Sequence, residues 1–245
     1  MALHALTDLA AAIGNVPRIP VLVAEDVVLL GYGVVLLALR PREDTPANSD
    51  PHPVLDRLDR ALHTTDRIVA AVGPDQWVQP SPCAGWTVRD EANHLVGGLR
   101  IFTAQLDGSV VSDDHDGHDW LGRDPAAAYH HAALADSPAW RRPGALDRTF
   151  DLAVGQVPAS MALVVHLTEV VVHGIDLAVA TGHEELVDQE QAAWLLTQMQ
   201  EIGTDPFRVP GIFGPELEAR PGARSHERLL AHLGRDLSPV LERAH

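Results

Sequence analysis

The chain has few cysteines, few basic residues and few aromatic residues, and the first two shortages exclude particular kinds of protein. Cys83 is the only cysteine among 245 residues, so no disulfide can form within the chain. This usage fits the reducing cytoplasm, which is the location we expect. Only 18 basic residues stand against 34 acidic ones, which gives a formal net charge of −16. Such a chain repels nucleic acids and anionic membranes on average, so we expect neither as a partner.

Aromatic residues make up only 4% of the chain although 46% of it is hydrophobic, because Ala, Leu and Val supply most of the apolar side chains. This composition favours helices that pack through aliphatic faces. The sequence contains no glycine-rich phosphate loop, dinucleotide fingerprint or G-x-S-x-G elbow. It therefore does not predict a nucleotide-binding enzyme or a serine hydrolase of the common kinds.

Residues 1–50 are expected to be an N-terminal extension and linker outside the core fold. Their apolar run, Val27 to Leu39, is shorter than the roughly 20 residues that span a bilayer. Glu25 and Asp26 precede the run, so it also lacks the basic start of a signal peptide. Residues 51–245 are expected to form one domain.

This domain has helical periodicity and no convincing pattern of alternating strands. Thr87 and Asp90 are close to a capping box and predict the start of a helix. The dipeptide Asp124-Pro125 predicts another start, and Gly182 predicts the end of the longest helix. The expected helices cover residues 54–72, 88–106, 125–135, 158–181, 189–202 and 225–233. The predicted fold is all-α, a four-helix bundle followed by short C-terminal helices.

The longest predicted helix carries four polar side chains on one face of an apolar stretch, HLTEVVVHGID. Glu169 and His173 are about 40° apart around the helix and one turn apart along it, so both side chains can reach one point. His166 and Asp176 fall within the same arc of about 80°. Polar side chains on such a face need partners, and a divalent metal ion suits a carboxylate and an imidazole.

A third ligand must come from another helix, and His94 is the best candidate. It lies in the middle of a predicted helix, in the sequence VRDEANHLVGG, and is followed by two apolar residues. Two histidines and one glutamate would leave one coordination position open, as in catalytic zinc sites. The residues alone leave two alternatives open, namely that Glu169 and His173 form a surface pair and that His94 is an ordinary core histidine.

Other residues with reactive side chains receive structural interpretations. The acidic loop of residues 113–119 is expected to be mobile and to hold no metal ion. His130 and His131 are expected to face solvent. Cys83 is interpreted as a small packed residue because the sequence shows no base or cation beside it, and Trp86 as an anchor before a helix.

Two motifs, SPCAGWTVRDEANHLVGG and HLTEVVVHGIDLAVATG, together resemble the DinB-like superfamily. Within it, the chain resembles the actinobacterial metal-binding proteins related to mycothiol-dependent maleylpyruvate isomerase, over roughly residues 54–236. The resemblance implies a four-helix bundle with a long crossover connection. It also implies a metal ion held by one histidine of the second helix and by an acidic residue and a histidine of the long helix. These positions fall on His94, Glu169 and His173.

The resemblance implies a divalent metal, with zinc first and nickel or another ion as alternatives, and a low-molecular-weight thiol as cofactor. A thiol or an electrophile is the expected small-molecule partner, and Asp176 and His166 are expected to support the ligands or to handle protons. Two functions remain open, a thiol-dependent transferase or isomerase and a non-catalytic regulatory or interaction module. An apolar cavity of at least ~300 Å³ above the metal would favour the enzyme, and a closed site the module. The sequence also leaves open whether the chain forms a homodimer.

Overall fold

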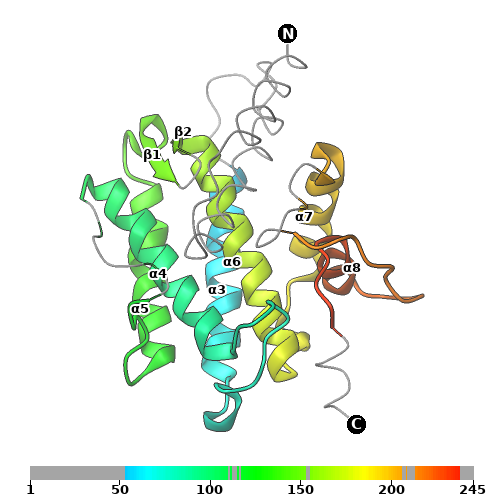
Figure 1. Ribbon diagram of the computed structural model, residues 1–245. Coiled ribbons are helices and arrows are strands. Elements are labelled where there is room, and N and C mark those ends of the chain that lie inside the picture. The colour runs from blue at the N-terminus through cyan, green and yellow to red at the C-terminus, as the bar shows by residue number, and fades with distance from the viewer. Residues whose placement is uncertain are drawn as a thin grey trace, which may run out of the picture.

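A computed structural model describes residues 53–109, 111, 115, 117–152, 155–205, 208 and 213–237. The expected N-terminal extension, with its apolar run from Val27 to Leu39, lies outside the described residues. Four long helices form the bundle (Figure 1): α3 (Pro53–Ala71), α4 (Val88–Asp107), α5 (Pro125–Trp140) and α6 (Ala159–Thr181). Both α5 and α6 pack against α3 and α4. The predicted all-α bundle is confirmed.

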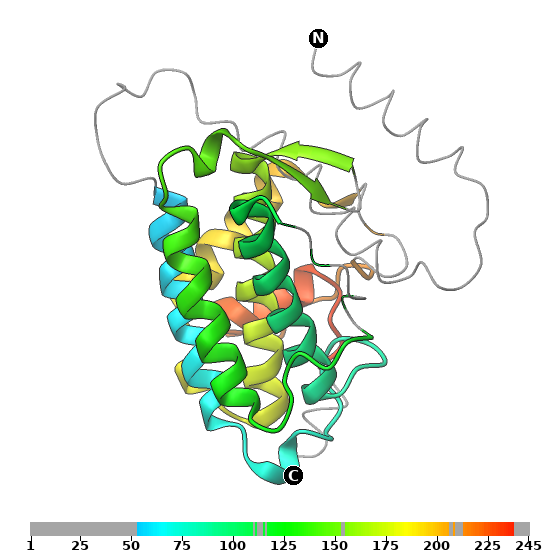
Figure 2. The same cartoon turned by 90° about the vertical axis from the view of Figure 1, so that its left-hand side faces the viewer.

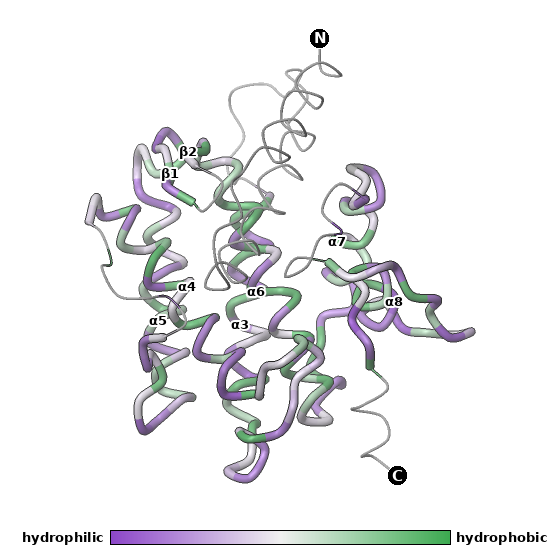
Figure 3. Tube along the Cα trace, viewed as in Figure 1, coloured by the Kyte–Doolittle hydropathy of each residue, from purple (hydrophilic) through white to green (hydrophobic). Residues whose placement is uncertain are grey.

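Helix α6 is the centre of the hydrophobic core. Every residue from Ala162 to Thr181 is buried, whereas α3 and α4 each keep an exposed polar face. Figure 3 shows this difference as mixed polar and apolar colours along α3 and α4. Within the described part of the chain, α6 is the one helix with the length and apolar composition of a membrane span. Its complete burial among the other helices accounts for that composition.

The predicted long crossover connection joins α4 to α5, which run in the same direction (Figure 2). Arg89 near the start of α4 pairs with Asp119 at 2.9 Å, and the Asn93 side chain donates to the carbonyl of His118 at 2.8 Å. At the other end, Asp107 of α4 pairs with Arg142, just after α5. The connection therefore returns along α4 to the end of the bundle where both helices begin.

A short hairpin between α5 and α6 corrects the expectation that no strands occur. Strands β1 (Thr149–Leu152) and β2 (Gly155–Pro158) pair antiparallel, with Phe150 opposite Val157. Both of these side chains are buried on the bundle. Four-residue strands are too short to show a clear alternation in the sequence.

Helix α5 also continues beyond its predicted end at Ala135. The helix reaches Trp140 with Pro138 inside it. A proline removes the hydrogen bond to the carbonyl four residues earlier. That residue is Leu134, which lies on the exposed side of the helix.

The C-terminal region forms a smaller unit beside α6. Helices α7 (Gln189–Ile202) and α8 (Ser225–His232) pack against each other (Figure 1). Arg60 of α3 pairs with Asp188 at 2.6 Å at the start of α7. The described residues also include three 3-10 turns: η1 (Pro74–Gln76), η2 (Ala145–Asp147) and η3 (Glu184–Leu186).

Candidate metal centre

The candidate centre lies where α4 faces α6. The start of α4 is fixed by the predicted capping box, in which Asp90 N donates to Thr87 Oγ1 at 3.2 Å and Thr87 N donates to Asp90 Oδ2 at 2.9 Å. His94 follows one turn after Asp90 and points into the bundle, where it is buried. Local capping chemistry thus sets where this side chain meets α6.

The structure brings His94, Glu169 and His173 together. The carboxylate oxygen Glu169 Oε2 lies 3.2 Å from His94 Nε2 and 3.1 Å from His173 Nε2. One ligand atom from each residue lies within 4.8 Å of the others, and all three side chains are buried. This group could hold a metal ion.

Two atoms of this group test whether a metal ion fits. Glu169 Oε1 and His173 Nε2 are buried and have no hydrogen-bond partner, although His173 Nε2 is close to the other oxygen of Glu169. A buried polar atom without a partner costs about 1–3 kcal/mol. Two imidazole nitrogens and a carboxylate oxygen are ligands that zinc accepts. The residues therefore fit a divalent cation, which would satisfy both atoms.

The charges within the group reinforce one another. Burial alone would raise the pKa of Glu169, but hydrogen bonds and positive charge from His173 and His94 lower it well below its usual range. Burial would likewise lower the pKa of His173, but the carboxylates of Glu169 and Glu91 raise it. A proton between His173 and Glu169 therefore occupies the position that a cation can take. Cation binding would compete with protonation of His173.

Glu91 is the direct partner of His173, a role that the sequence analysis missed. His173 Nδ1 and Glu91 Oε1 are 2.7 Å apart, and Glu91 is fully buried. Asp176, the predicted supporting residue, has its Oδ2 at 3.8 Å from the same nitrogen and accepts a bond from Arg235 Nε at 3.1 Å. Burial raises the pKa of Asp176 to about 7 against the opposing charge of Arg235. The signal for Glu91 was its position one turn before His94.

Aromatic rings cover the group. The His115 ring lies 4.4 Å from the His94 ring, and its Nε2 donates to the His94 carbonyl at 3.0 Å. The Trp86 ring lies 4.9 Å from His94 and 5.9 Å from His173. His115 belongs to the acidic loop that was expected to hold no metal ion, and the structure places its ring against His94. Trp86 does sit before α4, and it also contacts both histidines.

A small cavity borders the group between α4 and α6. Its volume is about 20 Å³, and its lining includes His94, His115, His166 and Glu169. A cavity of this size holds about one water molecule. The centre is therefore nearly closed.

His166 has its own partner at the edge of this cavity. Its Nε2 lies 2.9 Å from Asp136 Oδ2, and Asp136 Oδ1 accepts from Thr103 at 3.3 Å. The ring packs 4.3 Å from that of Phe102. His166 was expected to support a ligand or handle protons; the structure places it beside the candidate centre but bonded to α5.

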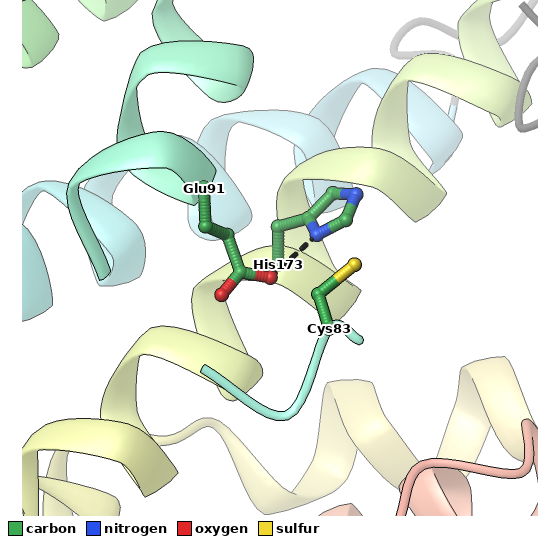
Figure 4. Close-up of side chains that lie close together, drawn as sticks. All are labelled: Cys83, Glu91 and His173. Carbon is green, nitrogen blue, oxygen red and sulfur yellow. Dashed lines mark hydrogen bonds and ion pairs between the residues drawn. The ribbon is translucent and has the colours of Figure 1, made fainter. Parts of the chain in front are cut away.

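Cys83 lies closer to the centre than its sequence suggested. It is half-buried, and its sulfur lies within 4.8 Å of ligand atoms of Glu91 and His173 (Figure 4). The sequence showed no base or cation beside Cys83, and the structure places Glu91 and His173 there. Burial raises the pKa of the Cys83 thiol, so it stays protonated at neutral pH. His130 and His131 are exposed, as predicted.

Comparison with known proteins identifies the family of the chain. Residues 58–178 match the family model described as the mycothiol maleylpyruvate isomerase N-terminal domain. The chain belongs to this family. The match includes His94, Glu169 and His173, and it agrees with the predicted DinB-like resemblance.

Two relatives extend the comparison beyond the family domain. They are uncharacterized proteins of Mycobacterium tuberculosis, one from strain CDC 1551 / Oshkosh and one from strain H37Rv. Each is 32% identical over 183 residues, which cover 72% of this chain and 94% of the relative. No solved structure matches the chain.

Proposed function

We propose that the chain binds one divalent metal ion through His94, Glu169 and His173 and uses it with a low-molecular-weight thiol, of the mycothiol type, in a transfer or isomerisation reaction. The observation that carries the metal site is Glu169 Oε1, a buried carboxylate oxygen without a hydrogen-bond partner, beside two buried histidines that share the other oxygen. Membership of the family supports the choice of thiol. Zinc is the first expected metal, and nickel or another divalent ion is the alternative.

The chain's own residues prepare the site. A bound divalent ion would supply a Lewis acid that lowers the pKa of a thiol or water molecule. Glu91 accepts the Nδ1–H of His173, so that Nε2 is the nitrogen that would bind a cation once its own proton has left. Trp86 and His115 cover the two histidines and limit the access of water.

A second candidate, a non-catalytic metal-binding regulatory or interaction module, is favoured by the size of the cavity. About 20 Å³ is far below the ~300 Å³ at which small-molecule sites begin. A thiol the size of mycothiol would enter only after part of the wall, such as His115, moved away. The two candidates share the metal site and differ in whether this movement occurs.

Metal analysis of purified protein tests the site. We expect about one ion per chain in wild type and in the control His130→Ala, which removes an exposed histidine, and much less in His94→Ala and His173→Ala. Circular dichroism should confirm that all four proteins are folded. Equal metal content in all of them would end the proposal.

A thiol screen separates the two candidates. Mycothiol, bacillithiol and glutathione are titrated into the metal-loaded protein, and turnover of electrophilic substrates is then measured. Binding and turnover of one thiol would support the enzyme, and failure of all three would support the module.

The presence of one cysteine and the acidic net charge support a cytoplasmic location without nucleic-acid or membrane partners. A measurement of mass in solution decides whether the chain is a homodimer.

A further inference from the structure

A second group of ligand atoms lies on the other edge of the His173 ring. Cys83 from the loop before α4, Glu91 from α4 and His173 from α6 converge there (Figure 4). One ligand atom from each lies within 4.8 Å of the others. Glu91 Oε1 is 2.7 Å from Nδ1, whereas Glu169 approaches Nε2. The two groups thus use opposite nitrogens of one imidazole.

The carboxylates at this edge have unused acceptor atoms. Glu91 Oε2 and Asp176 Oδ1 have no hydrogen-bond partner, and both side chains are fully buried. Arg235 Nε donates to the other oxygen of Asp176. Burying two acidic side chains beside each other is costly unless a positive charge compensates them. Arg235 supplies one such charge, and the two remaining oxygens are places where a cation would add to it.

We propose that Cys83, Glu91 and His173 Nδ1 form an alternative position for a thiophilic divalent cation such as Zn²⁺ or Cd²⁺. A thiolate among the ligands selects soft metal ions over hard ones, whereas the carboxylate and imidazole are accepted by many divalent ions. Asp176 Oδ2, 3.8 Å from the same nitrogen, brings a further carboxylate to this edge. Ligand atoms around zinc lie 2.0–2.3 Å from the ion, so a group spread over 4.8 Å needs only a small contraction.

The two positions exclude each other at neutral pH because a neutral imidazole has only one lone pair to offer. When a cation occupies the Cys83 position, Nδ1 gives up its proton to solvent and Nε2 keeps the proton that faces Glu169 Oε2 at 3.1 Å. The thiol of Cys83 loses its proton to solvent as the sulfur binds. The chain therefore holds one ion at a time. This inference does not depend on the proposed function, which uses neither Cys83 nor Glu91 as a ligand.

Cadmium titration tests the position, because Cys83 is the only thiol and any sulfur-to-metal charge-transfer absorbance reports on it alone. We expect wild type to develop this absorbance, saturating at one ion per chain, and Cd²⁺ to protect the thiol from a thiol-specific reagent. Cys83→Ser should abolish the absorbance, and Glu91→Gln should weaken binding roughly tenfold or more. His94→Ala, which removes a ligand of the other position only, should keep the absorbance, as should the control His130→Ala.

Several results would overturn the inference. One is the absence of charge transfer in wild type. Another is saturation at half an ion per chain, since the ion would then bridge two chains. A third is absorbance that survives unchanged in both Glu91→Gln and His173→Ala. If Cys83→Ser fails to fold by circular dichroism, the last two variants still decide the question. Metal analysis of Cys83→Ser with and without His94→Ala tests the proposed function separately, because both of these proteins lack the Cys83 group and differ only in a ligand of the other position.

Discussion

Gly97 of α4 lets the crossover connection approach the candidate centre, and replacing it tests this packing. A Cβ added at Gly97 would lie 2.5 Å from His115 Cδ2 and 2.7 Å from Trp120 Nε1. The neighbouring Gly98 is a matched control, since its added Cβ would meet only His115 Nε2, at 3.8 Å. The Trp120 ring has little freedom to yield, because its Nε1 donates to the His115 carbonyl at 2.6 Å.

The expected magnitude follows from comparing the two variants. Replacing a helical glycine by alanine gains about 1 kcal/mol of helix propensity, and this gain is common to both positions. Overpacking costs about 1–3 kcal/mol, and only Gly97→Ala incurs it. We therefore expect Gly97→Ala to be less stable than Gly98→Ala by about 2 kcal/mol. For a domain of this size that corresponds to a difference in Tm of roughly 4–8 °C.

Denaturant unfolding and thermal melting of the two variants measure this difference, and amide hydrogen exchange locates it. If His115 and Trp120 move away instead, the stability difference shrinks but exchange in residues 115–122 speeds up in Gly97→Ala alone. Two variants with the same stability and the same exchange would show that the connection does not pack on α4 as described.

Two further predictions concern other contacts of the fold. Gly174→Ala would place a Cβ 2.3 Å from Thr65 Oγ1, between α6 and α3, and should cost about 1–3 kcal/mol. Adding Thr65→Ala should restore part of this loss in a double-mutant cycle, and strict additivity would contradict the contact. Burial, followed by the charge of Arg224, lowers the pKa of His226 to about 4. The neutral ring therefore contributes stability above about pH 6.5 that is lost as the pH falls toward 4. His226→Asn should flatten this part of the unfolding curve against pH, and parallel curves for variant and wild type would refute the assignment.

Helix boundaries were predictable because they depend on local chemistry. The capping box at Thr87, the cap at Asp124 and the left-handed glycine at Gly182 each act within one turn, so the sequence displays them directly. The hairpin was not predictable in the same way. Strand β1 is held partly by Gln105 of α4, whose amide pairs with both backbone groups of Asp151 at 2.8 and 3.0 Å. A contact made across 46 residues leaves no periodic signal in either segment.

The candidate centre was predictable to a different extent for each residue. Glu169 and His173 share one helix, so helical geometry alone places them together. His94 required the assumption that two helices face each other, which the family resemblance supplied. Cys83 and His115 lie on loops whose path depends on tertiary packing, and residues in such positions cannot be located from periodicity.

The pattern of partners around α6 gives the strongest reason to regard Glu169 as functional. An apolar core helix carries four buried ionisable side chains: His166, Glu169, His173 and Asp176. His166, His173 and Asp176 each pair with one side chain from another element, on α5, on α4 and in the segment after α8 respectively. Glu169 instead presents one oxygen to two histidines and leaves the other oxygen without a partner. A purely structural network would be expected to satisfy both oxygens, since an unsatisfied buried carboxylate oxygen destabilises the fold. The fold bears this cost at Glu169, as it does at the neighbouring Glu91 and Asp176, and a divalent cation bound between Glu169 and the two histidines would remove it there.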